Sequence, residues 1–357
     1  MNLLNKFYFI LLSFLFFSNS VLSSNLDHDK DFSTKSLINN FQVRFMLRSE
    51  FKGIFDGEEN SIGYANKPAM IAAGFDMGEK LSFYGRYRFD LPSTIQKDGT
   101  PVSLLNFNLQ YKPIENLKIV VGKQTMLQGS WEFEYNPIDV YYYSLMGNNI
   151  QGFVSGVALH YDIKKSHLAF QLSKVVDQDF LWNDSSTGVN GTLYYSADLK
   201  NGFYKPIWSY TYTYAGDNRS LHNVMIGNQF NINRFRLEVD LMAQNAFRYY
   251  AKEQKKTDEY SVVGKLEYFL PKNRVSLATK YAFDRRNLAS TGEKVTEEHT
   301  CSMQMRYLLS KNYNINLHST VAYRVNERDE KYSDIFSGNR EKFFSIGFTW
   351  DFTTKSL

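Results

Sequence analysis

Regular alternation of apolar and polar residues, interrupted by gaps of two alternating lengths, constrains this chain most strongly. Between Phe41 and Phe352, about sixteen segments carry an apolar residue at every second position, and long gaps between them take turns with short ones. Successive side chains of a strand point to opposite faces, so each segment is expected to be a strand with one apolar and one polar face. The pattern predicts an all-β chain that forms a transmembrane, up-and-down antiparallel β-barrel of about 16 strands.

Two segments show how the faces differ. Residues 41–51 alternate Phe, Val and Leu with polar residues that include Arg44 and Arg48, and residues 81–91 alternate aromatic and leucine side chains with Arg86 and Arg88. A soluble β-sandwich or barrel also alternates, but sixteen such strands in series would need an oversized core. In lipid an open sheet edge is not tolerated, so the wall is expected to close on itself.

The short gaps are rich in Gly, Pro and Asn, as tight turns require, whereas the long gaps are mostly polar. The short gaps are residues 77–80, 112–116, 200–202, 271–273 and 310–312. The long gaps are residues 53–67, 92–102, 125–150, 176–191, 243–258, 285–297 and 327–341, with 215–222 as the weakest. If the chain begins in the periplasm, all short turns face the periplasm and all long loops face outward.

The first residues have the pattern of a secretory signal. Lys6 precedes an apolar run over residues 7–17, which is too short for the roughly 20 residues that a spanning helix needs, and small residues follow at Ser20 and Ser23. We predict a signal peptide at 1–23, a polar lead-in at 24–40, the barrel at 41–352 and a tail at 353–357. Without the signal, the net charge falls from +4 to +3, which is too weak to indicate a nucleic-acid partner.

Cysteine usage excludes several kinds of site. Cys301 is alone, so the chain cannot form an intrachain disulfide, a cysteine-based zinc site or an iron–sulfur site, and its place in the alternation predicts a lipid-facing side chain. The sequence also lacks a phosphate-binding glycine loop, an HExxH motif and a calcium-loop pattern. We therefore expect no cofactor and no bound metal.

The third long gap, residues 125–150, is the candidate constriction of a pore. It is aromatic and acidic, has no Lys or Arg between 126 and 151, and is long enough that it must pack against something. The polar faces of the first and third segments offer arginines opposite its acids, and such charges select ions in channels. The candidate pore residues are Arg44, Arg48, Arg86, Arg88, Glu132, Glu134 and Asp139.

Residues 120–124 (VVGKQ) and 133–141 (FEYNPIDVY) resemble the phosphate-selective porins of the O and P type, in the version common in Bacteroidetes-like bacteria. The resemblance implies a 16-stranded barrel that is often trimeric. Phosphate-selective members line their constriction with Arg and Lys clusters, which this third loop lacks. Phosphate or anion selectivity is therefore kept as an alternative.

These features predict a porin in the bacterial outer membrane. It would contact lipid and give passive diffusion of small hydrophilic solutes, with a mild anion preference because the polar faces are slightly basic. The resemblance further implies a homotrimer. The chain is not expected to be an enzyme. The alternative from another class is an outer-membrane barrel hydrolase. Its candidates would be His222 and His299, with Ser220 and Glu297 or Glu298 close by in sequence.

Overall fold

The computed structural model describes residues 39–56, 60–96, 98–181, 188–250, 253–311, 314–328 and 340–354. The predicted signal peptide lies outside these residues, as do most of the lead-in and of the tail, so these three assignments stay predictions. Most of the predicted gap at 327–341 also lies outside them.

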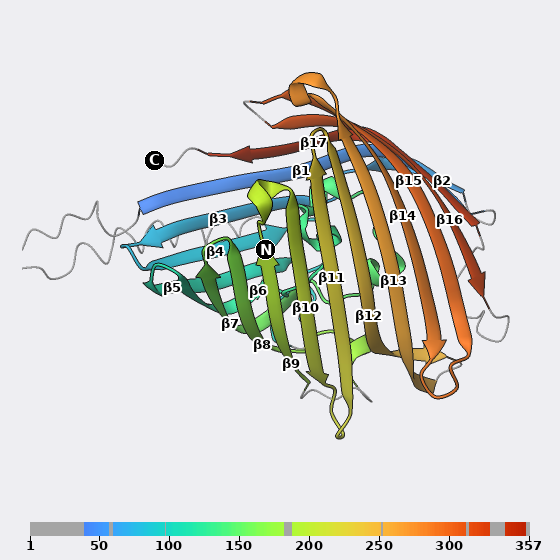
Figure 1. Cartoon of the computed structure of the whole chain (residues 1–357), viewed down its shortest axis with the longest axis horizontal. Coiled ribbons are helices and arrows are strands. Elements are labelled where there is room, and N and C mark those ends of the chain that lie inside the picture. Colours follow the sequence, from blue (N-terminus) through green and yellow to red (C-terminus); the bar gives the residue numbers. More distant parts are fainter. Residues whose placement is uncertain are drawn as a thin grey trace, which may run out of the picture. The chain divides into compact units, whose positions relative to one another are not determined.

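The described strands form one antiparallel sheet of 17 strands (Figure 1). They are β1 (Asn39–Phe55), β2 (Asn60–Ala65), β3 (Ala69–Met77), β4 (Leu81–Arg88), β5 (Leu104–Ile114), β6 (Leu117–Thr125), β7 (Phe153–Ile163), β8 (Ser166–Lys174), β9 (Val189–Ala197), β10 (Tyr204–Tyr214), β11 (Ser220–Ile232), β12 (Phe235–Tyr250), β13 (Glu253–Phe269), β14 (Val275–Leu288), β15 (Lys294–Ser310), β16 (Ile315–Arg328) and β17 (Arg340–Thr353).

The sheet closes because its first and last strands pair. β1 pairs with β17 along one edge, from Arg44 opposite Thr353 to Phe55 opposite Lys342. Along its other edge, β1 pairs with both β3 and β2, which follow each other as two parts of one wall strand. The wall therefore has sixteen strand positions, and the predicted closed, up-and-down antiparallel barrel is confirmed.

Side chains alternate between the two faces of the wall. On β12, Leu237 and Leu241 are exposed on the outer face, whereas Glu238 and Asp240 are buried on the inner face. Cys301 is exposed in the same outward set as Met303 and Met305, as its position in the sequence predicted. An apolar outside and a charged inside reverse the arrangement of a soluble protein and match that of a membrane barrel.

Three predicted long loops, at 53–67, 243–258 and 285–297, are largely strand, and this part of the prediction was wrong; in the last of them β14 continues to Leu288 and β15 begins at Lys294. β1 continues to Phe55 and β2 begins at Asn60, within the predicted gap 53–67. Similarly, β12 and β13 stay paired from Phe235 opposite Tyr268 to Tyr250 opposite Glu253, across most of the predicted gap 243–258. Backbone pairing continues there although polar residues occupy both faces, so the alternation that marks a strand in the sequence disappears before the strand ends.

The short connections lie together at one end of the barrel, which is called the turn end here. The beginning of β1 near Asn39 and the end of β17 near Thr353 lie at the same end. Asn233 in the β11–β12 turn has a φ of 55°, a left-handed conformation that asparagine tolerates well. The opposite end carries the longer connections and is called the loop end.

Helical segments are short. They are α2 (Trp131–Glu134), η2 (Pro137–Asp139), α3 (Leu145–Asn148), η3 (Gln178–Phe180), η4 (Lys200–Gly202) and η5 (Pro271–Asn273). In the described part of the chain, no helix has the length and apolar character needed to cross a bilayer. The first three segments belong to the connection between β6 and β7, residues 126–152, which is called loop 3 below.

Candidate pore and its lining

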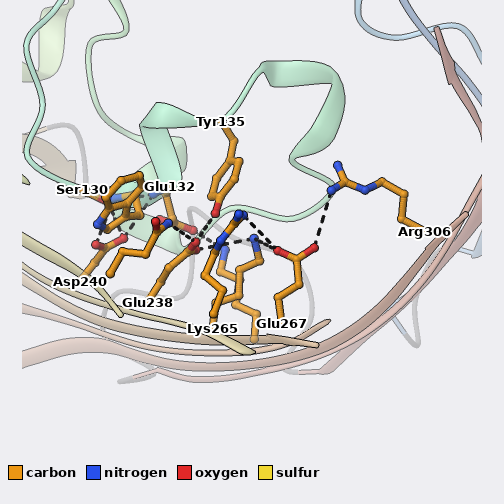
Figure 2. A network of polar contacts seen from close by, with 12 residues as sticks. Ser130, Glu132, Tyr135, Glu238, Asp240, Lys265, Glu267 and Arg306 are labelled. Carbon is orange, nitrogen blue, oxygen red and sulfur yellow. Dashed lines mark hydrogen bonds and ion pairs between the residues drawn. The ribbon is translucent and has the colours of Figure 1, made fainter. Parts of the chain in front are cut away.

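Loop 3 lies against the inner face of the barrel wall, and Asp240 on β12 fixes its beginning. The Asp240 carboxylate accepts hydrogen bonds from the Ser130 hydroxyl at 2.7 Å and from the Trp131 amide at 3.0 Å. The Glu132 amide donates to the same carboxylate at 3.3 Å (Figure 2). A carboxylate at this position satisfies amide groups that the first turn of a helix leaves without partners. Asp240 thus attaches the start of α2 to the wall.

Glu132 and Asp284 attach the far part of loop 3 to the neighbouring wall. The Glu132 carboxylate accepts hydrogen bonds from the Ser144 amide at 3.0 Å and hydroxyl at 2.6 Å, and it forms an ion pair with Lys280 on β14. Lys280 also donates to the Tyr142 carbonyl at 2.7 Å. Asp284, also on β14, accepts hydrogen bonds from two backbone amides at the start of α3, at 3.1 and 3.2 Å.

A ladder of charges on β12 and β13 continues this attachment (Figure 2). The Tyr135 hydroxyl donates to Glu238, and the Lys265 ammonium lies 4.0 Å from the centroid of the Tyr135 ring. Lys265 is also 3.6 Å from the Glu238 carboxylate and 3.8 Å from that of Glu267. Each acid of this ladder therefore has a cation or a hydroxyl group beside it.

Asp139 on η2 ends the ladder at β15. Its carboxylate lies 3.4 Å from the Arg306 guanidinium, which is also 3.6 Å from Glu267. Burial raises the pKa of Asp139 above its ordinary value, and the positive charge of Arg306 opposes this shift only in part.

The middle of loop 3 reaches the strands on either side of the barrel seam. Arg48 on β1 donates to the Val140 carbonyl at 2.7 Å, and its guanidinium carbon lies 5.1 Å from the centroid of the Tyr141 ring. The Tyr142 hydroxyl donates to Glu341 on β17 at 3.0 Å. Loop 3 is thus held at β12–β15 and at β1 and β17.

A cavity of about 1060 Å³ remains between loop 3 and the wall that includes β1, β4 and β6–β9. Aromatic rings of loop 3, including Tyr141, Tyr142 and Tyr143, form part of its lining. Its charged lining consists of Arg44, Arg48, Arg86, Arg88, Lys118, Arg324, Glu134 and Glu341, with His160 and His167 beside them.

The structure brings the four predicted arginines together on this cavity, but their partners differ. Arg44 is held by Asp351, with a hydrogen bond of 2.6 Å, and Arg88 makes two hydrogen bonds to Asp90, at 2.9 and 2.8 Å. Arg86 stacks over the Phe153 ring at 5.2 Å, and its buried Nε has no hydrogen-bond partner within the described ranges. Among the described residues no carboxylate pairs with Arg86.

The three predicted acids do not face the arginines together. Glu132 and Asp139 turn toward β14 and β15, where Lys280 and Arg306 neutralise them. Glu134 alone of the three is exposed to the cavity. The sequence suggested an acidic loop opposite a basic wall, but only one of the three predicted carboxylates faces the cavity that the arginines line.

Several lining residues were absent from the candidate set. Lys118 and Arg324 line the cavity, while Asp240, Lys280 and Asp284 hold loop 3. In the sequence, these residues lie on the polar faces of the alternating segments, which predicts that they point into the barrel. That position does not tell whether a residue contacts loop 3 or lines the cavity.

The histidines considered for a hydrolase lie on the outer face of the wall. The His222 Nδ1 is 2.8 Å from the Tyr210 hydroxyl, and the His299 Nδ1 is 2.8 Å from the Tyr281 hydroxyl. Glu297 lies 3.5 Å from His299. Within the described ranges, no group of three or more His, Cys, Asp or Glu side chains is arranged to hold a metal ion.

Comparison with known proteins supports the fold. No protein-family profile matches the sequence, and no curated protein matches it. Among solved structures, the chain is similar to an anion-selective porin from Comamonas acidovorans, with 11% identity, a TM-score of 0.62, and coverage of 88% of this chain and 100% of that one.

Two further solved structures are similar at the same level. OmpT of Vibrio cholerae in its trimer form has 13% identity and a TM-score of 0.60, over 88% of this chain and 99% of that one. The outer-membrane channel DcaP of Acinetobacter baumannii has 12% identity and a TM-score of 0.57, over 89% and 96%. At such low identity these likenesses show a shared barrel fold, and the phosphate-selective O and P family is not confirmed by them.

Proposed function

We propose that this protein is a porin of the bacterial outer membrane, through which small hydrophilic solutes diffuse passively. The observation that carries this proposal is a closed wall with an apolar outer face around a polar cavity of about 1060 Å³. In a membrane, such a closed wall leaves no strand edge with unpaired backbone groups, and its interior can remain filled with water. Neither a cofactor nor covalent chemistry is part of the proposal.

Loop 3 forms the narrowest part of the proposed channel. Its attachments at Asp240, Lys280 and Asp284 support this role, because they hold the loop across the interior instead of leaving it outside. A fixed loop would restrict solute size, as constrictions do in other channels.

A mild anion preference follows from the charges that remain after pairing. Arg44, Arg88 and Arg324 have carboxylate partners within hydrogen-bonding or ion-pairing distance. Among the described residues, Arg86 and Lys118 have no ion pair, and the exposed Glu134 opposes them. The lining therefore keeps a small positive excess, which supports a weak preference and not strict phosphate selectivity.

Conductance in planar lipid bilayers tests the proposal. Purified protein should give stepwise, ohmic currents, and the reversal potential in a potassium chloride gradient should indicate that chloride is preferred. The absence of any current from correctly folded protein would overturn the porin proposal. Block of the chloride current by low concentrations of phosphate would favour the phosphate-selective alternative.

The same proposal includes a homotrimer and no enzymatic activity. Vibrio cholerae OmpT, with a similar fold, is described in a trimer form, which supports testing this chain by chemical crosslinking in detergent. His222 and His299 contact tyrosine hydroxyl groups on the outer face, a poor arrangement for a catalytic base. Hydrolysis of an ester or peptide by the purified protein, abolished in His299→Ala or His222→Ala, would contradict the absence of catalysis.

A further inference from the structure

Two histidines face each other inside the barrel near its turn end. His160 on β7 and His167 on β8 point into the cavity, and the His160 Nδ1 lies 3.1 Å from the His167 Nε2. The two rings are half-buried, with their centroids 5.2 Å apart. None of the contacts that hold loop 3 uses this pair.

The distance between these nitrogens suits a shared metal ion. Two nitrogens that bind one Zn²⁺ at about 2.0–2.1 Å lie roughly 2.9–3.4 Å apart for bond angles between square and tetrahedral. In the metal-free state, one nitrogen must carry a hydrogen that it donates to the other. When a metal ion takes the position of that hydrogen, His160 changes tautomer and carries the same hydrogen on Nε2, so that both facing nitrogens are free to bind the ion.

Asp162 supplies the outer contact that metal-binding histidines usually have. Its carboxylate lies 2.6 Å from the His167 Nδ1 and directly opposite His167 in the strand register. A carboxylate that accepts the Nδ1 hydrogen directs the lone pair of Nε2 away from it, here toward His160. A carboxylate, the imidazole that it orients and a second imidazole facing the first are therefore already assembled.

We propose that His160 and His167 form a two-imidazole site for a divalent transition metal, such as Zn²⁺ or Cu²⁺, in the lumen. Imidazole nitrogens bind these ions, whereas Mg²⁺ and Ca²⁺ require oxygen ligands. Water fills the remaining coordination positions, because the part of the chain that the structure describes places no third protein ligand beside the pair. A bound ion adds two positive charges to the lining of the cavity.

Lys118 sets a limit on the affinity. It lies opposite His160 in the register of β6 and β7, and its positive charge repels a metal ion. The Tyr194 ring packs against His167 at a centroid distance of 6.0 Å and adds no charge. Removal of the Lys118 charge should therefore tighten metal binding, which a merely structural histidine pair would not do.

Equilibrium dialysis of the detergent-solubilised full chain against Zn²⁺ tests the site. We expect one Zn²⁺ per chain, displaced by EDTA, with Cu²⁺ bound more tightly and no saturable binding of Ca²⁺. His160→Gln and His167→Gln should each abolish binding. The matched control His222→Gln/His299→Gln, which removes the outward histidines, should retain it.

Two further variants separate a metal site from a structural pair. Asp162→Asn should weaken Zn²⁺ binding about 10–100-fold, as loss of an outer contact does elsewhere, and Lys118→Gln should strengthen it. Heat-modifiable mobility on gels verifies that each variant folds into a barrel. Unchanged binding in folded His160→Gln or His167→Gln protein, or no saturable binding by the wild type, would overturn the proposal.

Dialysis does not depend on transport, so the two proposals fail separately. Protein that binds Zn²⁺ but carries no current would keep the metal site and remove the porin function. Protein that conducts but binds no Zn²⁺ would do the reverse. If both hold, Zn²⁺ in the bath should alter the current of the wild type but not that of His160→Gln.

Discussion

The two sides of the lumen contain the same residue types but use them differently. On β12–β15, Asp240, Lys280 and Asp284 are covered by loop 3 and hold it in place. On β4 and β6, Arg86 and Lys118 line an open cavity. A charge on the inner face of a barrel is therefore not a pore charge by itself. It becomes one only where the interior loop leaves it uncovered and without a partner.

The largest effect is expected where a covered charge loses its partner. Glu132→Ala leaves the Lys280 ammonium, whose side chain is only 13% exposed, without its carboxylate. Breaking such a buried pair should lower the free energy of unfolding by about 3–5 kcal/mol and release loop 3, so single-channel conductance should rise. Thermal unfolding in detergent, followed by tryptophan fluorescence, measures the first effect.

The control for this variant is a pair at the turn end. Asp198 lies 3.2 Å from Lys205, and both side chains are at least one-third exposed. Asp198→Asn should change stability by no more than about 1 kcal/mol and leave conductance unaltered. Equal losses in both variants would mean that loop 3 is not held by its buried charges.

The open side should control ion preference. Arg86→Gln removes a positive charge that has no carboxylate partner among the described residues. Such a charge is worth about 1 kcal/mol on an ion at 4 Å in water, roughly fivefold in favour of chloride and roughly fivefold against potassium, so the chloride-to-potassium permeability ratio should fall by up to roughly 25-fold. The double variant Arg44→Gln/Asp351→Asn removes a charge and its partner together, so its ratio should stay near that of the wild type. Reversal potentials that shift equally in the two proteins would contradict the distinction between paired and unpaired arginines.

A smaller effect is expected from pH on the covered side. Because the pKa of Asp139 is raised by burial, this carboxylate should lose its charge at a higher pH than an ordinary aspartate does. As the pH falls from about 7 to 4, Arg306 loses one of its two partners and anion preference should increase. Asp139→Asn should show the increased preference already at neutral pH.

This measurement belongs in a His160→Gln/His167→Gln background, so that a change of charge on the lumen histidines cannot contribute to it. There, the pH dependence should become smaller in Asp139→Asn; the part that remains is expected from Glu134, whose pKa is also raised by burial. A full pH response in that triple variant would assign the effect to another group.

The wall was predictable from sequence because one physical requirement repeats along it. Each strand must place apolar groups outside and polar groups inside, so a period of two residues persists from β1 to β17. The requirement ends where the strands leave the apolar band. Residues 243–258 therefore look like a loop in the sequence, although Tyr250 still pairs with Glu253.

The site was predictable only in part. Alternation places Arg44, Arg86 and Arg88 inside the barrel, and the structure puts them on one cavity. The alternation could not show that Glu132 and Asp139 pair with Lys280 and Arg306 instead of facing these arginines. The orientation of the two acids depends on which distant strand each loop residue contacts. Contacts between loop 3 and β14 or β15 span well over a hundred residues and leave no local pattern.

Pairing between β1 and β17 has a consequence for how the protein is made. The seam joins residues near the two ends of the described chain, from Arg44 with Thr353 to Phe55 with Lys342. Until the final strand arrives, both edges of an inserted sheet would face hydrocarbon with unsatisfied backbone groups, which lipid does not tolerate. Insertion is thus expected only after synthesis is complete, and a ribosome product that stops before Arg340 should remain in the aqueous compartment as a substrate for chaperones and proteases.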